Sequence, residues 1–298
     1  MDWQNGERPP RNYFTIPHGR DVSKSSVTAR NAIRRNAISG TIELCIKAVT
    51  EIHIGTGGFT EYDGRLVKDV VRTNGIPVIP GSSIKGPIRQ IHEAVFQGGD
   101  PWQEEVKRGN VSHAQLSLSA ALFGALGYQG RLAFEDAVPI PTDGDAEIVQ
   151  ICLSAQYEPR LSEGRRFYGK MPQEAQQEPR IPALAIPRGT ILLTYLHFDE
   201  VTKMELGTIL RCMGLADSFK VRDGFQVRLG GGKYDGFGLA KFSPGKFKLM
   251  SKTLDDGLIQ YWHENDEETR AFCGQLLKAS NPNDNEQNIL ATFRENMH

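Results

Sequence analysis

The stretch Ile79-Pro80-Gly81-Ser82-Ser83-Ile84-Lys85-Gly86 opens the clearest helix in this sequence. Apolar residues continue at helical spacing to Val95, and Ser82 or Ser83 is expected to cap the first turn. The first N–H groups of a helix have no partner within it. With two hydroxyls and the Lys85 amine beside them, they can hold an anion such as a phosphate diester. A capped helix without a ligand is the alternative.

A second stretch, Leu229-Gly230-Gly231-Gly232-Lys233-Tyr234-Asp235-Gly236-Phe237-Gly238, is dominated by glycine. Glycine lets the backbone adopt positive φ and approach a ligand closely, while Lys233 adds charge and Tyr234 or Phe237 a stacking surface. The stretch is not a Walker loop, because Tyr234 stands where Ser or Thr would follow the lysine. A flexible hairpin turn is the alternative.

A third stretch, Glu51 to Gly58, predicts a strand that ends in the loop Gly55-Thr56-Gly57-Gly58. Two carboxylates, Asp63 and Asp69, follow in a charged segment. His53 within this strand could act as a catalyst, but an alternating strand more often holds such a histidine as a satisfied sheet residue.

Composition limits the class of protein. The chain has 298 residues, of which 39% are hydrophobic and 24% charged, as expected for a soluble globular protein. No apolar run reaches the ~18 residues that cross a bilayer, and no signal core opens the chain, so we expect a cytoplasmic protein without a membrane partner. The four cysteines lie far apart and predict buried free thiols, not a zinc site.

Charge and composition divide the chain into three parts. Residues 1–38 predict a basic flexible arm, residues 39–250 a core, and residues 251–298 an acidic helical tail. A proline-rich segment at about 139–187 predicts an inserted hairpin or loop excursion within the core. Oppositely charged ends suit a protein that touches both a polyanion and protein neighbours, and two solvated ends are the alternative.

The order of expected elements indicates an α+β fold. A strand at 41–47 precedes helices near 82–95 and 113–126, and a strand at 131–136 follows. After the excursion come a strand at 190–198, a helix at 203–213 and two strands that flank the glycine stretch. A sheet with helices on one face suits this order, and a ferredoxin-like or RNA-recognition-motif-like core is the natural candidate.

Four segments together give the chain a family resemblance. They are HIGTG at 53–57, IPGSSIKGPIR at 79–89, LFGALGYQGRLAFEDA at 122–137 and GGGKYDGFGLAKF at 230–242. In this order they resemble the RAMP superfamily of CRISPR-associated proteins over residues 41–242. The resemblance implies a ferredoxin-like core in a backbone-type subunit of a type III effector complex. The implied partners are guide RNA, target RNA, other RAMP subunits and a large polymerase-like subunit.

The resemblance also implies roles for particular residues. Guide RNA would lie along the helix start and the glycine stretch, in contact with Ser82, Ser83, Lys85, Arg89, Gly230, Gly231, Gly232, Lys233, Tyr234 and Gly236. Within the excursion, Arg165 and Arg166 stand among aromatic residues, a pattern that can bind RNA by stacking and charge. A surface loop of mixed charge is the alternative there.

Repeating backbone subunits of this superfamily cut target RNA through an aspartate and a divalent metal. The order of Asp63, the pair Lys68-Asp69 and the segment that begins at Ile79 resembles theirs. This places the cutting role and Mg²⁺ on Asp63, with Asp69 second. A structural or end-capping subunit that only binds RNA is the alternative. An acyl-transfer enzyme, suggested by the S-x-x-K spacing from Ser82, lacks its other motifs and an export signal.

Overall fold

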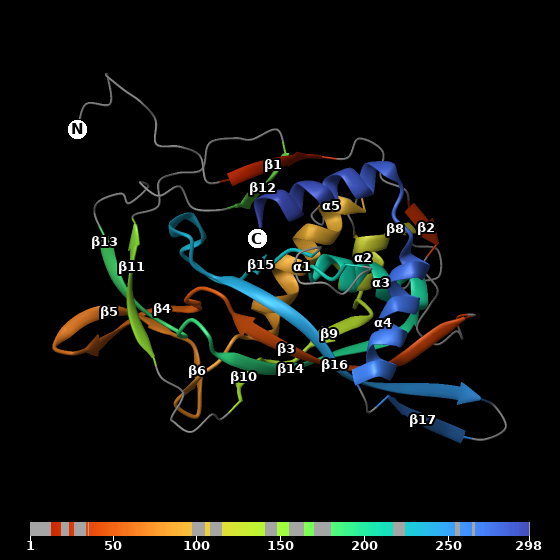
Figure 1. Ribbon diagram of the computed structural model, residues 1–298, viewed down its shortest axis with the longest axis horizontal. Coiled ribbons are helices and arrows are strands. Elements are labelled where there is room, and N and C mark those ends of the chain that lie inside the picture. The colour runs from red at the N-terminus through yellow and green to blue at the C-terminus, as the bar shows by residue number, and fades with distance from the viewer. Residues whose placement is uncertain are drawn as a thin grey trace.

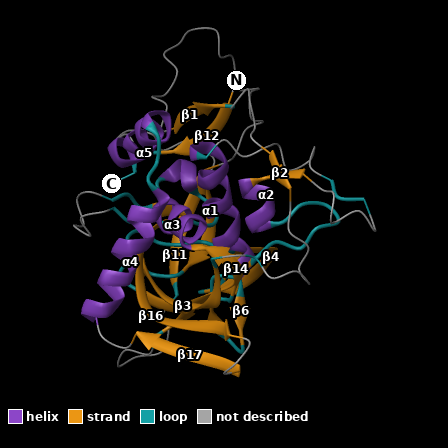
Figure 2. Cartoon of the chain, turned by 90° about the vertical axis from the view of Figure 1, so that its right-hand side faces the viewer, coloured by secondary structure: helices purple, strands orange, loops and turns teal. Residues whose placement is uncertain are grey.

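The computed structural model describes residues 13–18, 24–26, 34, 36–96, 105–107, 115–140, 148–154, 164–169, 180–216, 224–253, 257–263 and 266–297. Within these ranges the chain forms a large antiparallel sheet, a smaller four-stranded sheet and helices (Figure 1). The helices gather on one side of the large sheet (Figure 2). The expected mixed α+β class is confirmed.

Three long antiparallel strands form the centre of the large sheet: β14 (Ile191–Thr202), β3 (Ala37–Ala48) and β16 (Leu239–Thr253). Shorter strands pair with their outer edges, β9 and β10 with β14, and β15 and β17 with β16. The short strands are β9 (Leu132–Phe134), β10 (Val138–Pro139), β15 (Val227–Arg228) and β17 (Gly257–His263).

The helices are α1 (Gly81–Val95), α2 (Leu118–Phe123), α3 (Lys203–Cys212), α4 (Asp266–Ser280) and α5 (Asp284–Asn296). None of them, in the described part of the chain, has the length and apolar character needed to cross a bilayer. The expected helix at 113–126 is in fact β8 (Gln115–Ser117) followed by α2. Ser117 has an extended backbone and accepts a hydrogen bond from the Ala120 N–H, which stops β8 and begins α2.

The expected cap of α1 is wrong. Pro80 occupies the N-cap position and makes no side-chain capping bond, so both serines lie inside the first turn of the helix. The Gly81 N–H instead donates a hydrogen bond of 2.8 Å to Asp136 Oδ1, from the segment after β9. A carboxylate from elsewhere in the chain therefore satisfies a free N–H at this helix start.

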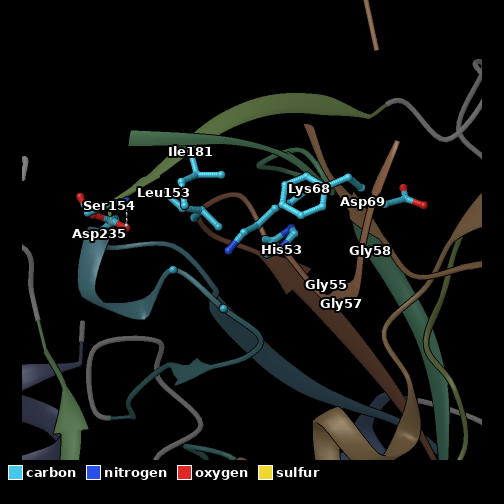
Figure 3. A pocket seen from close by; sticks show the side chains of 13 residues that line it. His53, Gly55, Gly57, Gly58, Lys68, Asp69, Leu153, Ser154, Ile181 and Asp235 are labelled. Atoms are coloured by element: carbon cyan, nitrogen blue, oxygen red, sulfur yellow. Dashed lines mark hydrogen bonds between the residues drawn. The ribbon is translucent and has the colours of Figure 1, made fainter. Parts of the chain in front are cut away.

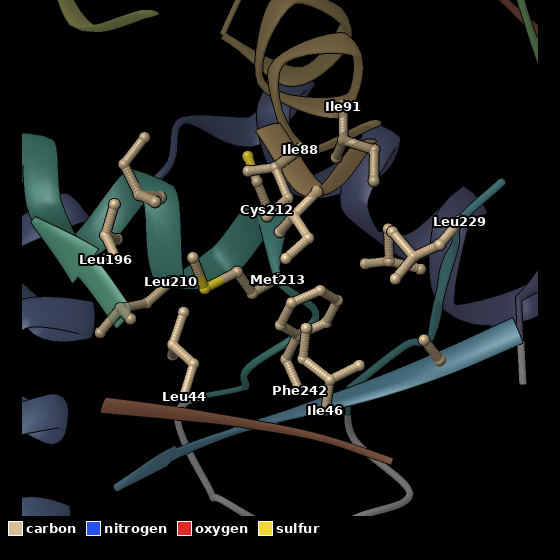
Figure 4. Close-up of a cluster of buried hydrophobic side chains, with 14 of the residues drawn as sticks. Leu44, Ile46, Ile88, Ile91, Leu196, Leu210, Cys212, Met213, Leu229 and Phe242 are labelled. Carbon is tan, nitrogen blue, oxygen red and sulfur yellow. The ribbon is translucent and has the colours of Figure 1, made fainter. Parts of the chain in front are cut away.

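The main core lies between the helices and β3, β14 and β16 (Figure 4). Alternate residues of β3, among them Leu44 and Ile46, are fully buried, and Ile88 and Ile91 of α1 face them. Burying one such side chain contributes roughly 1.5–3 kcal/mol. This shared burial fixes α1, and with it the start of that helix, over the sheet.

The second sheet has the strand order β11-β13-β5-β4. Its members are β4 (Gly55–Tyr62), β5 (Arg65–Val70), β11 (Val149–Ser154) and β13 (Arg180–Ala185). The loop expected at Gly55–Gly58 is therefore the start of a strand, and the charged segment after it belongs to a hairpin. Buried Val67 and Val70 anchor β5 beneath charged neighbours. A short hairpin, β6 (Arg72–Thr73) with β7 (Ile76–Pro77), leads back towards α1.

Two short strands lie within residues 1–38, where the sequence predicts a flexible arm. These are β1 (Tyr13–Pro17), which pairs with β12 (Gly164–Tyr168) of the excursion, and β2 (Lys24–Ser26), which pairs with β8. Phe14 of β1 stacks on Phe167 of β12, and both rings contact Phe293 of α5. The beginning, middle and end of the chain therefore meet in one aromatic cluster. Much of the remaining arm and excursion lies outside the described residues.

Candidate functional site

The glycine loop, residues 230–238, folds directly against the strand end at His53. The Gly231 N–H donates a hydrogen bond of 2.8 Å to the His53 carbonyl. Gly230 and Gly232 have φ angles of 72° and 68°, and a Cβ on Gly230 would stand 2.3 Å from that carbonyl oxygen. These glycines are therefore required by the contact between two parts of the chain.

Arg228 fixes the far side of the glycine loop. Its guanidinium donates to the carbonyls of Gly236 and Phe237 in the loop, and to those of Tyr168 and Gly169 at the end of β12. Burial lowers the Arg228 pKa to about 10. Because its donors are engaged inside the protein, Arg228 holds the loop in shape and is not a free cation.

The glycine loop is also tied to the excursion. Asp235, at the end of the 3₁₀ turn η2 (Lys233–Asp235), accepts hydrogen bonds from the N–H and the hydroxyl of Ser154 on β11, at 3.0 and 2.6 Å. Both carboxylate oxygens are used in this way. The loop is thus attached to three separate segments of the chain.

A cavity of about 520 Å³ opens where these segments meet (Figure 3). Its lining comes from the His53 strand end, the β4–β5 hairpin, β11 and β13, and the glycine loop. The side chain of Lys68 extends into this space, and Leu153 and Ile181 lie on the side of β11 and β13. The sequence alone predicts no binding or catalytic role for these three residues. The sequence signal for Lys68 is its apolar neighbour Val67, which is buried. Successive side chains of a strand point to opposite faces, so Lys68 points away from the buried face.

His53 is a buried sheet residue on the floor of the cavity. Its Nδ1 lies 2.6 Å from the Leu184 carbonyl oxygen, and because a carbonyl only accepts, Nδ1 donates. Burial lowers the His53 pKa, which outweighs the opposite effect of that hydrogen bond. The neutral, bonded ring agrees with the satisfied sheet residue expected from the alternating strand pattern, and not with a catalyst.

The structure separates the two predicted acidic residues. Asp63 is exposed at the tip of the β4–β5 hairpin, whereas Asp69 borders the cavity. Asp69 Oδ1 accepts hydrogen bonds from Arg72 Nη1 at 2.6 Å and from the Val70 N–H, and its carboxylate points away from Lys68 (Figure 3). Among the described residues no group of three or more His, Cys, Asp or Glu side chains could hold a metal ion. These residues do not fit a Mg²⁺ site made by the protein alone.

Three of the predicted RNA-binding cations are engaged within the fold. Arg89 donates to the buried carboxylate of Glu93 at 2.7 Å, and Arg165 donates to its other oxygen. The amine of Lys85 lies 3.5 Å from the Leu132 carbonyl oxygen, and burial lowers its pKa. A sequence cannot show that Glu93 pairs with Arg165, because 72 positions separate them.

Two other predicted contact residues, Arg166 and Lys233, do come together. One pocket of about 150 Å³ is lined by Arg166 of β12, Lys233 of the glycine loop, and Pro87 and Gln90 of α1. Ser83 precedes Pro87 by one helical turn, so it stands on the same face of α1. Burial, with the nearby charge of Arg228 second, lowers the Lys233 pKa.

Arg166 also stacks over the Tyr13 ring, at 4.4 Å from its centroid. Ser82 is exposed, Ser83 and Tyr234 are half-buried, and the Gly236 carbonyl accepts from Arg228. The cysteines only partly follow expectation, since Cys212 and Cys273 are buried but Cys152 is exposed and Cys45 half-buried.

Comparison with known proteins bears on this arrangement. The sequence pattern of the RAMP superfamily matches residues 45–246, more than half of the chain. The chain is also similar to the CRISPR system Cms endoribonuclease Csm3 of Enterococcus italicus, with 31% identity over 93 residues. That match covers 26% of this chain and 44% of the relative's length. The chain therefore belongs to the RAMP superfamily.

Proposed function

We propose that this chain binds guide RNA as a subunit of a type III CRISPR effector complex, in contact with target RNA and neighbouring subunits. Superfamily membership and the similarity to Csm3 support the proposal. A ferredoxin-like core is part of it. The chain order β3-α1-β9-β14-α3-β16, with the spatial order β16-β3-β14-β9 and antiparallel pairing throughout, supports that topology.

The observation that carries the proposal is the meeting of two glycine-bearing segments beside two available lysines. Gly231 binds the His53 strand end, and cavities on either side of this contact hold Lys68 and Lys233. In the described part of the chain neither lysine forms an ion pair with a carboxylate. Of the other cations near these cavities, Arg228 is engaged internally and Arg166 stacks over Tyr13, so we assign the phosphate contacts to the two lysines.

Lys233→Ala tests this proposal. We expect weaker binding of guide RNA, by a similar factor for every guide sequence, because phosphates carry no sequence information. The slope of log K against log salt should fall by ~1. The measurement is a salt titration of guide-RNA affinity by fluorescence anisotropy.

Lys47→Ala is the matched control, since Lys47 is an exposed lysine on β3. It should leave both affinity and slope nearly unchanged. An equal effect of the two substitutions, or a loss confined to some guide sequences, would contradict the proposal.

Cleavage of target RNA is a second candidate function. The endoribonuclease name of the relative favours it, as does the exposure of Asp63 on a hairpin that extends from the body of the protein. Asp69, held by Arg72, is less available. A structural or end-capping subunit would keep the phosphate contacts without any cutting residue.

A further inference from the structure

We propose that the cavity between the β4–β5 hairpin and the glycine loop is a subsite for one nucleotide of single-stranded RNA, whose base stacks on Phe59 and whose phosphate binds Lys68. This inference rests on the proposed RNA-binding function and gives roles to Phe59, which no family motif marked, and to Lys68, which the family pattern marked only as the neighbour of Asp69. It depends on a juxtaposition in one space: an exposed aromatic ring, an apolar wall and an amine that forms no ion pair with a carboxylate of the described residues.

Phe59 is the first part of the subsite. The residue is 56% exposed although it lines a cavity, so the ring remains accessible from that space. A phenylalanine ring left this open presents a flat apolar surface to solvent. Bases stack on such rings irrespective of their identity, because every base has a π-face.

Lys68 is the second part. Phe59 and Lys68 are directly paired across the antiparallel β4–β5 hairpin, so their side chains leave the same face of it. The Lys68 side chain extends into the cavity (Figure 3). A base on the ring would place its own phosphate within reach of a long side chain on the neighbouring strand.

The remaining walls agree with a nucleotide. Leu153 and Ile181 supply apolar surface from β11 and β13, and Gly231 and Gly232 add no side chains to the floor. Two carboxylates also line the cavity, and both already have partners within the protein. The carboxylate of Asp235 binds Ser154, and that of Asp69 binds Arg72. The volume of about 520 Å³ lies within the roughly 300–1,000 Å³ typical of small-molecule sites.

The test compares RNA with and without bases. Binding of a labelled ten-nucleotide oligoadenylate and of an abasic ribose-phosphate strand of equal length is measured by anisotropy, for the wild type, Phe59→Leu, Phe59→Tyr and Lys68→Gln. Stacking is worth ~1–3 kcal/mol per base, so Phe59→Leu should weaken oligoadenylate binding at least about fivefold. It should leave the abasic strand unaffected, and Phe59→Tyr should match the wild type. Lys68→Gln should weaken both strands.

Other outcomes overturn the assignment. If Phe59→Leu changes neither strand, or both equally, while Lys233→Ala still weakens binding, the subsite is wrong and the proposed function stands. If the wild type binds neither strand, both fail. Displacement of the oligoadenylate by an equal concentration of adenosine monophosphate would assign the cavity to free nucleotides instead. Thermal melting checks the fold of each variant, and little change is expected because Phe59 is exposed.

Discussion

Asp63 and Gly64 form the turn that joins β4 to β5, with φ angles of 51° and 68°. Two-residue hairpin turns of type I′ need positive φ at both central positions, and Asp-Gly is a favoured pair for them. The turn alone therefore explains why aspartate stands here. A role in cutting RNA needs a test that separates the carboxylate from the backbone geometry.

Asp63→Asn makes that separation, because asparagine also tolerates the left-handed conformation. If the carboxylate cuts, Asp63→Asn abolishes cleavage of labelled target RNA by the complex assembled with guide RNA and Mg²⁺. Guide binding and the melting temperature should stay at wild-type values. Asp63→Ala should lose cleavage too and cost about 1–2 kcal/mol of stability in addition, measured by urea unfolding. Full cleavage by the asparagine variant would remove Asp63 from the chemistry.

Single residues also show how far the sequence predicts the candidate site. The glycine loop and Lys233 stand out in the sequence, because five glycines and this lysine fall within residues 230–238. The internal partners of Arg89 and Arg165 are not visible, since Glu93 reaches one along a helix and the other across the tertiary fold. Phe59 carries no local signal because its exposure depends on how β4 pairs.

At the scale of elements, one histidine joins three helices. His92 of α1 is fully buried, with Nδ1 at 2.6 Å from Ser119 Oγ of α2 and Nε2 at 2.9 Å from Thr208 Oγ1 of α3. Burial, with the charge of Arg89 second, lowers the His92 pKa from 6.5 to about 3. The folded protein thus holds a neutral imidazole among these helices across the ordinary pH range.

This histidine predicts a pH dependence of stability. Below pH 6.5 the unfolded chain binds a proton that the folded chain does not, so stability falls as pH falls towards the folded pKa of about 3. Between pH 7 and pH 5 the loss from His92 should be about 2 kcal/mol. Urea unfolding at the two pH values measures it, and His92→Gln should be less stable at pH 7 but lose about 2 kcal/mol less on acidification. Equal pH slopes for both proteins would refute this assignment.

The elements differ in how readily the sequence predicts them. β3, α1 and α3 follow from apolar periodicity, and α4 and α5 lie within the segment 251–298 that the sequence predicts to be helical. The β4–β5 hairpin was missed because most of its residues are polar and exposed, so only Val67 and Val70 mark a buried face. α2 was misjudged because Ser117 divides the segment into a strand and a short helix.

At the scale of the whole molecule, distant parts of the chain meet in the aromatic cluster around Phe293, which belongs to the main core. Phe293 of α5 is fully buried, with its ring centroid 4.7 Å from that of Phe167, 5.4 Å from that of Phe14 and 5.3 Å from that of Phe225. The division into arm, core and tail stays a prediction. These contacts join all three parts physically.

Phe293→Ala should therefore destabilise the entire protein. Removing a buried phenylalanine costs about 3–5 kcal/mol, because it combines lost burial with a cavity. The free energy of urea unfolding is the measurement. Phe59→Ala is the matched control, since the same substitution at an exposed site should cost far less. A loss at Phe293 no larger than at Phe59 would mean that α5 contributes little to the fold.

Arg228 has a mechanical consequence. Its guanidinium lies between the end of β12 and the glycine loop, and it donates to carbonyl groups of both. Pulling the two apart would leave the buried Gly169 carbonyl oxygen without this donor, at about 1–3 kcal/mol, and would also break the bonds to three partly buried oxygens. Lysine could not replace it, because a single ammonium lacks the planar fork that reaches both sides. Any displacement of β12 should therefore move the glycine loop with it, as one rigid unit.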